Sequence, residues 1–420
     1  SVGKDSSFHF SLVSAFRRLC VPRKKSDEEK RLEHEMEPAQ IEQMRQMSAG
    51  PGGAAPKERE DNPNTLAALA ARLVNDDATL VVAELVAHTQ SDSLKAAAAD
   101  VLLAMAQTVD GRGKMVQQGG WKAALGLALH DDAEISKTAA WALAKIAISI
   151  NPIMYPRRID SNPESMVKPL LKLVDTYENE LQAFEGCLAL CNLATVDELK
   201  ERMVKCGAWR TVQMTLTSSN EQLQRAALEV MCNLCTHDEI IERFCAADSQ
   251  ELRIFIGFAQ SDDPKAVVAA TGALATLLPV PEIGERFVQS EKGIEAFVEI
   301  ALNPDSEPAL LHRAAVGLKA LFAHHTDALV GTPDADEPPA HALVVLGSLM
   351  MLSKVGNCPP AKQAAVEAIV ALRQARPDVA LPPHEAVAQV VERIKAEAEK
   401  RAEELRLEEE EAAAEAAAAA

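Results

Sequence analysis

Apolar residues recur with helical spacing along much of the chain, and residues 139–152 are the clearest case. Trp141 and Ile148 are two helical turns apart and lie on one apolar face of this stretch. Asn151 and Pro152 end the helix, because proline disfavours helical geometry in the residue before it. The pattern predicts one long, largely buried helix.

Similar apolar runs recur at a nearly constant interval. The runs begin at Leu102, Leu143, Leu190, Met231, Leu274 and Leu318. The interval between them is about 40–47 residues, which is the period of armadillo and HEAT repeats. Each repeat is expected to contain two shorter helices and a long third helix that carries the recurring run. The sequence therefore predicts an all-α fold, an armadillo/HEAT-like right-handed superhelical solenoid.

Polar breaks and glycine turns separate the expected helices. The breaks are residues 130–133, 218–220, 261–264 and 303–306. Their Asp, Asn and Ser side chains are expected to cap the third helices that follow. Glycine at positions 119–120, 207 and 293 is expected at the corner between the two shorter helices, where the backbone needs extra freedom.

Composition divides the chain into three parts. Residues 1–64 contain an amphipathic basic segment, a charged helix and a linker rich in glycine and proline. Residues 65–394 are the expected repeat domain. Residues 395–420 are acidic and rich in Ala and Glu, which predicts a charged helical tail at the C-terminal end of the solenoid.

The opening segment, residues 6–25, combines phenylalanines with a basic end and contains no acidic residue. This pattern is typical of a membrane-surface helix, a partner-docking helix or the remnant of a targeting peptide. The alternative is a cap on the first repeat, because the exposed end of a solenoid needs covering. In that case Phe8, Phe10 and Phe16 dock on the repeat domain.

The composition narrows the function classes. The net charge of −19 argues against a nucleic-acid binder, because neutralising a phosphate backbone requires a basic face. No apolar run approaches the ~20 residues that a membrane-spanning helix needs. The eight cysteines lie mostly in apolar helical runs, as in reduced proteins of the cytoplasm.

Catalytic and metal-binding signatures are absent from the sequence. It contains no glycine-rich phosphate loop, nucleophile elbow or paired-histidine metal helix. Cys187 and Cys191, like Cys232 and Cys235, are about one turn apart within helices, where buried thiols explain them more simply than zinc ligands. The sequence therefore predicts a binding protein with no catalytic residue, metal or cofactor.

One recurring position of the third helices carries polar residues between apolar neighbours. Aligning the helices places Lys145, Asn192, Asn233 and Thr276 at this position. Repeat solenoids bind partners along an extended concave surface, and a carboxamide offers a donor and an acceptor to the main chain of a peptide. These residues are therefore a candidate peptide-binding row. The alternative is that they bridge neighbouring helices or cap carbonyl groups inside the stack.

Several motifs resemble the UCS-domain family of myosin-directed chaperones, in the family's order and at about its spacing. They are Ala142-Leu-Ala-Lys-Ile-Ala147 with Asn151-Pro152, Leu190-Cys-Asn-Leu-Ala194, Arg225-Ala-Ala227 with Met231-Cys-Asn-Leu234, Gly272-Ala-Leu-Ala275, and His312-Arg313. The resemblance covers roughly residues 110–330. It implies an armadillo array whose groove holds the myosin motor domain during folding and protects it from aggregation.

The resemblance also implies which residues line the client-binding groove. They would be Lys145, Asn151, Asn192, Asn233 and Arg313. The family's loop after Asn-Pro has an aromatic-Pro-Gly step, which corresponds here to Tyr155-Pro156 followed by Arg157 in place of glycine.

Animal members of the family carry an N-terminal tetratricopeptide module that docks heat-shock chaperones, and residues 1–64 do not resemble it. Either this chain has the shorter, fungal-like organisation, or the module lies outside it. The expected partners are a myosin motor domain as client and heat-shock chaperones as helpers. A non-catalytic armadillo scaffold subunit of a stable assembly is the alternative, and an enzyme with an unrecognised site is the third.

Overall fold

The computed structural model describes residues 2–22, 62–156, 162–175, 179–247, 249–303, 305–335 and 337–383, with scattered positions from 385 to 407. Within these residues every regular element is a helix, and no strand is present. The charged helix expected before residue 62 and almost all of the expected tail at 395–420 lie outside the described residues. The chain forms two units, Ser1–Val212 and Gln213–Ala420, which we call unit 1 and unit 2.

Unit 1 contains ten complete α-helices within its described residues. They are α1 (Val2–Cys20), α4 (Pro63–Asn75), α5 (Ala78–His88), α6 (Asp92–Ala106), α7 (Arg112–Gln117), α8 (Gly120–Ala128), α9 (Ala133–Ser149), α10 (Val167–Val174), α11 (Glu180–Leu193) and α12 (Asp197–Lys205). Three short 3-10 helices lie between them: η1 (Val109–Gly111), η2 (Pro152–Met154) and η3 (Pro163–Met166). Helix α13 (Ala208–Thr215) contains the boundary between the units.

The helices described in unit 2 continue the same pattern. They are α14 (Glu221–Leu234), α15 (Asp238–Cys245), α16 (Glu251–Ala259), α17 (Pro264–Leu277), α18 (Pro281–Val288), α19 (Glu291–Leu302), α20 (Pro308–His324), α21 (Thr326–Val330), α22 (Ala342–Lys354) and α23 (Pro359–Ala375).

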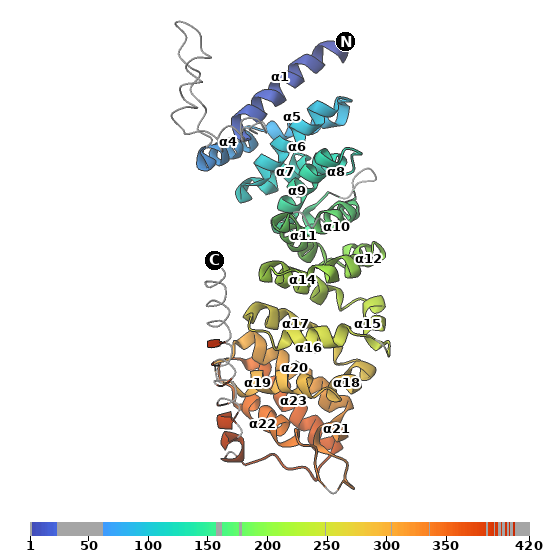
Figure 1. Cartoon of the computed structure of the whole chain (residues 1–420), viewed down its shortest axis with the longest axis vertical. Coiled ribbons are helices and arrows are strands. Elements are labelled where there is room, and N and C mark those ends of the chain that lie inside the picture. The colour runs from blue at the N-terminus through green and yellow to red at the C-terminus, as the bar shows by residue number, and fades with distance from the viewer. Residues whose placement is uncertain are drawn as a thin grey trace. The chain divides into compact units, whose positions relative to one another are not determined.

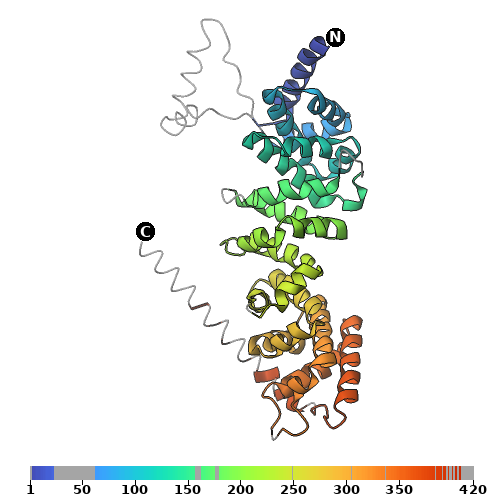
Figure 2. The same ribbon diagram turned by 90° about the vertical axis from the view of Figure 1, so that its right-hand side faces the viewer.

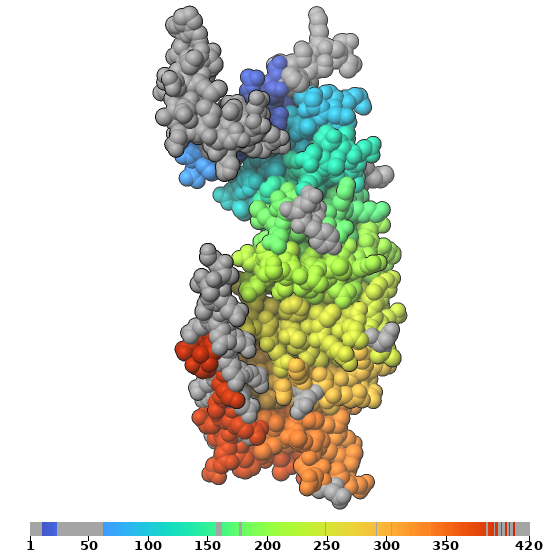
Figure 3. Space-filling model, viewed as in Figure 1, coloured from blue at the N-terminus to red at the C-terminus, as the bar shows by residue number. Residues whose placement is uncertain are grey.

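The six predicted third helices are all present, and within each unit each packs on the next. In unit 1 the order is α6, α9, α11, and in unit 2 it is α14, α17, α20, followed by α23 (Figures 1 and 2). Side chains fill the spaces between the ribbons of each unit (Figure 3). In α9, Ala139, Ala142, Ala144 and Ala147 are fully buried. Small side chains at these positions allow neighbouring helices to approach closely.

Three of the four polar breaks cap the helix that follows, as predicted. The capping side chains belong to Asp132 for α9, Asn220 for α14 and Asp263 for α17. The prediction is wrong for the break at 303–306. Helix α20 begins after Glu307, whose side chain does not cap it. The Asn303 side chain instead accepts a hydrogen bond from the backbone N–H of Asp305, which lies within the break.

The predicted glycine corners are of two kinds. Gly119 and Gly207 have φ values of +79° and +77°, which residues with a side chain rarely adopt. Gly293 lies inside α19 without a positive φ, so the prediction of a corner there is wrong. A Cβ on Gly293 would lie 2.9 Å from the ring of Phe287, so close packing explains the glycine.

Helix α1 is the amphipathic opening segment, and it packs against α4 and α6. Val13 and Cys20 are buried, and Arg17 forms an ion pair with Asp100 of α6 at 2.8 Å. This arrangement favours the cap among the alternatives for this segment. The side chains of Phe8 and Phe10 lie outside the described ones, and Phe16 is half-buried.

Packing at Gly317 gives a direct test of the stack in unit 2. A Cβ at this position of α20 would overlap the ring of Phe297 from α19, so Gly317→Ala is expected to lower the free energy of unfolding by about 1–3 kcal/mol. Gly257 of α16 has no other atom within 4 Å of a Cβ position. Gly257→Ala should therefore raise the free energy of unfolding by up to about 1 kcal/mol through helix propensity. Urea denaturation measures both, and equal effects would contradict the packing argument.

Candidate functional site

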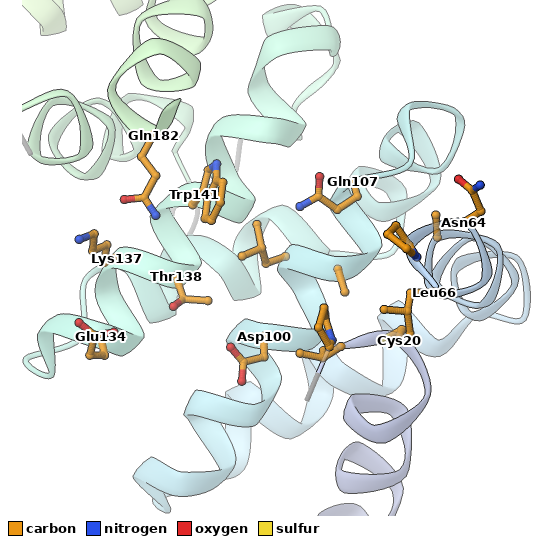
Figure 4. A pocket seen from close by; sticks show the side chains of 16 residues that line it. Cys20, Asn64, Leu66, Asp100, Gln107, Glu134, Lys137, Thr138, Trp141 and Gln182 are labelled. Carbon is orange, nitrogen blue, oxygen red and sulfur yellow. The ribbon is translucent and has the colours of Figure 1, made fainter. Parts of the chain in front are cut away.

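A pocket of about 740 Å³ lies on the third-helix side of unit 1 (Figure 4), and we call it the groove pocket. It is lined by Cys20, Val21, Pro22, Pro63, Asn64, Leu66, Ala67, Asp100, Leu103, Ala104, Gln107, Glu134, Lys137, Thr138, Trp141 and Gln182. Seven of these sixteen residues belong to α6 and α9 and an eighth, Gln107, directly follows α6; along both helices the lining residues are separated by three, one and three positions. That spacing places them on one helical face, so the groove pocket is formed by the facing surfaces of adjacent repeats.

Trp141 is held in place by a buried ion pair behind it. Its indole N–H donates to Oε2 of Glu185 on α11 at 2.5 Å. The Lys145 ammonium donates to the other carboxylate oxygen of Glu185 at 2.8 Å and lies 5.2 Å from the centre of the indole. The side chains of Lys145 and Glu185 are only 7% and 15% exposed. The charge of Lys145 is therefore paired within the stack, and its position serves to orient Trp141.

Arg112 of α7 joins the ends of two third helices in the same region. Its guanidinium donates to the carbonyl of Ala106 at 2.9 Å and to the hydroxyl of Ser149 at 3.0 Å. Burial lowers the pKa of Arg112, while the negative charge of Glu185 acts in the opposite direction. Arg112 therefore has a packing role and leaves no charge available to a ligand.

Tyr155 anchors the loop that follows α9. It is 2% exposed, and its ring packs edge-to-face on Trp121 with 5.3 Å between the ring centres. The hydroxyl has no hydrogen-bond partner among the described residues, and burial raises the pKa of Tyr155, so the phenol stays neutral. Tyr155 thus fixes the loop and does not present its ring to a partner. Arg157 lies outside the described residues.

The two asparagines expected in the groove of unit 1 both bond to nearby backbone. The amide nitrogen of Asn192 donates to the carbonyls of Ala147 at 2.7 Å and Ile150 at 2.8 Å, which are otherwise unpaired at the end of α9. The Asn151 side chain accepts from the backbone N–H of Ile153 and caps η2. For Asn192 the geometry is that of the alternative considered from sequence, in which it caps carbonyls inside the stack.

The remaining predicted residues belong to unit 2. Arg313 of α20 donates to the carbonyl of Val268 and lies against Gly272 of α17. The hydroxyl of Thr276, which is exposed, donates to the carbonyl of Gly272 at 2.9 Å. Asn233 of α14 is half-buried. Arg313 thus links α17 to α20, and of these residues Thr276 is the one whose side chain is well exposed.

Unit 2 has a second, smaller pocket of about 440 Å³ between α20 and α23. It is lined mainly by alanines and by His312, His324, Lys319 and Glu367. Lys319 and Glu367 join the two helices through an ion pair at 2.5 Å. Each unit therefore offers a concave surface formed by its third helices.

The groove pocket and the residue predicted on α9 occupy different turns of this helix. The groove pocket is lined by Trp141 and Thr138, one to two turns before Lys145. A tryptophan in a helix otherwise rich in alanine was the available signal, since large aromatic side chains are typical of binding surfaces. The sequence gives no comparable indication that Asp100 and Gln182 line the pocket, because their place in it depends on how neighbouring repeats are aligned.

Among the described residues no group of three or more His, Cys, Asp or Glu side chains is arranged to hold a metal ion. Within the same residues no helix combines the length and apolar character that a membrane span requires. All eight cysteines are free thiols. The groove pocket therefore offers an indole, aliphatic side chains and a few polar groups, which suit the binding of a protein segment.

Comparison with curated proteins finds relatives named protein unc-45 homolog B. No family model matches the chain. Protein unc-45 homolog B of Danio rerio is 32% identical over 307 residues, which are 71% of this chain and 31% of that protein. The human protein of the same name is 36% identical over 189 residues, or 44% of this chain and 20% of that protein. The chain spans about a fifth to a third of the length of these curated relatives.

Solved structures confirm the fold. UNC-45 from Drosophila melanogaster has a TM-score of 0.69 at 24% identity, with 89% of this chain and 45% of that chain covered. A structure described as the myosin chaperone UNC-45 from C. elegans in complex with a Hsp90 peptide has a TM-score of 0.64 at 20% identity, with 77% and 35% covered. The armadillo-like helical solenoid predicted from sequence is therefore correct.

The substitution Asn192→Ala tests whether this side chain stabilises the fold. Asn192→Ala leaves the carbonyls of Ala147 and Ile150 without their partner, so we expect the free energy of unfolding to fall by about 1–3 kcal/mol. Thr276→Ala removes an exposed hydroxyl at the same repeating position and should change it by less than about 0.5 kcal/mol. Thermal and urea unfolding of both variants measure the difference. An unchanged stability of Asn192→Ala would show that the cap contributes little.

Proposed function

The chain belongs to the UCS-domain family of armadillo-repeat proteins, and from that membership we propose that it is a chaperone for a myosin motor domain. The observation that carries the proposal is its 32% identity to protein unc-45 homolog B over 307 residues, which are 71% of this chain. The C. elegans relative is described as a myosin chaperone. A folding client is the partner that these similarities favour over a static scaffold.

The groove pocket supplies the binding chemistry of the proposal. An unfolded motor segment exposes apolar side chains, and burying each of them against the groove stabilises the complex by about 1.5–3 kcal/mol. Trp141 and Leu103 provide the apolar surface, and the Glu185–Lys145 pair keeps the indole in its orientation. We propose that Lys145 contributes to client binding only through Trp141, and that Asn151 lies at the margin of the groove pocket. Asn233, Thr276 and Arg313 are proposed as client contacts on the surface of unit 2.

The proposed activity is binding without catalysis and needs no cofactor. A groove that holds a non-native segment prevents aggregation simply by covering its apolar surface. We propose the cytoplasm as the site of action, which the eight free thiols favour because disulfides are rare in reducing compartments. Heat-shock chaperones are proposed as helpers, since the C. elegans relative has been described in complex with a Hsp90 peptide.

An aggregation assay tests the proposal. A myosin motor fragment is heated, and light scattering is followed with the chain added from substoichiometric to equimolar amounts. We expect scattering to fall as the chain is added, because the groove covers exposed apolar segments. A scaffold protein would bind folded partners and leave the heated fragment unprotected, and that result would refute the proposal.

A matched pair of variants assigns the protection to the groove pocket. Leu103→Glu places a charge in the pocket, and we expect client affinity to fall roughly ten- to a hundredfold. Leu80→Glu makes the same change on α5 of unit 1, where Leu80 is 51% exposed and does not line the pocket, and it should leave protection unchanged. Circular dichroism confirms that both variants are folded. Equal protection by the two variants would remove the groove pocket from the client surface.

A further inference from the structure

Helix α1 ends at the groove pocket. It packs on α4 and α6, and Cys20, Val21 and Pro22 at its C-terminal end line the pocket together with residues of α6 and α9 (Figure 4). Helix α4 contributes Pro63, Asn64 and Leu66 to the same pocket. The surface that carries α1 is therefore continuous with the proposed client surface.

The contact between α1 and this surface has a simple chemistry. Val13 and Cys20, seven residues apart, are buried on one face of α1. Between them Arg17 pairs with Asp100 of α6 at 2.8 Å, and the two side chains are 44% and 12% exposed. The surface therefore accommodates an amphipathic helix that has small apolar side chains on either side of a cation.

The chain keeps α1 attached to this surface. Residues 23–61 join α1 to α4 in the sequence, so α1 remains part of the molecule whether or not it is docked. Docking of a covalently attached segment is intramolecular and is favoured over docking of a separate one. Even weak docking is then populated, while a tighter ligand can still replace the helix.

We propose that this surface of α4 and α6 is a docking site for amphipathic helices with a cation facing Asp100, that α1 fills it in cis, and that a helical segment of the client displaces α1. The inference rests on the proposed function. It adds a preference for basic helices at one end of the groove, because the Asp100 carboxylate attracts a cation on the docked helix. It also makes client affinity depend on the fraction of molecules in which α1 is undocked.

A labelled synthetic peptide with the sequence of residues 1–22 is the probe, and its fluorescence anisotropy is measured with the full chain. Arg17→Glu in the chain weakens its own α1, so the peptide should bind this variant roughly two- to fivefold more tightly than the wild-type chain. The Asp100→Arg chain should lose affinity for the wild-type peptide and gain affinity for a peptide carrying Arg17→Glu. This reversal requires direct contact between positions 17 and 100 in the complex. Equal binding of both peptides to all three chains would overturn the docking site.

The client is tested in the same assay. An unlabelled myosin motor fragment should displace the labelled peptide from the Arg17→Glu chain. A fragment that is protected from aggregation but does not displace the peptide would overturn the competition and leave the proposed function intact. A fragment that is neither protected nor able to compete would refute both the proposed function and the part of the inference that concerns a client.

Discussion

The close approach of successive third helices is the constraint on which each unit depends. Within each unit every third helix packs on the next, and alanine fills five of the ten buried positions of α9. Larger side chains are accommodated elsewhere, as with Trp121 against Tyr155 and Phe287 against Phe297. Trp141 is the aromatic residue of α9, and it lines the groove pocket.

Polar groups inside the stack form hydrogen bonds and ion pairs with one another. Glu185 receives hydrogen bonds from Trp141 and Lys145, so a charge within an apolar helix has a buried partner. Asn192 caps the carbonyls at the end of α9, and Arg313 bonds to a carbonyl of α17. Each of these bonds joins one repeat to the next. The polar row that looks like a binding site in the sequence is therefore, at these positions, largely a set of links between repeats.

The repeat period and most helix starts could be predicted from sequence because they depend on local patterns. Asp132, Asn220 and Asp263 cap the expected helices, and the spacing of apolar runs gives the third helices themselves. The partners of Lys145 and Asn192 could not be predicted in this way, since Glu185 and Ala147 lie 40 and 45 residues away in sequence. Such pairings depend on how far one helix is displaced along the next. The helix within residues 139–152 could thus be predicted, whereas the partner of Lys145 within the stack could not.

The distribution of indoles has an optical consequence. The chain contains three tryptophans, of which Trp121 and Trp209 are 2% exposed, whereas Trp141 lines the groove pocket. The emission of an indole shifts with the polarity and hydration of its surroundings. A ligand that enters the pocket excludes water from Trp141 and leaves the two buried indoles in unchanged environments. The intrinsic fluorescence of the unlabelled protein is therefore a reporter of groove occupancy, and one that follows binding in real time.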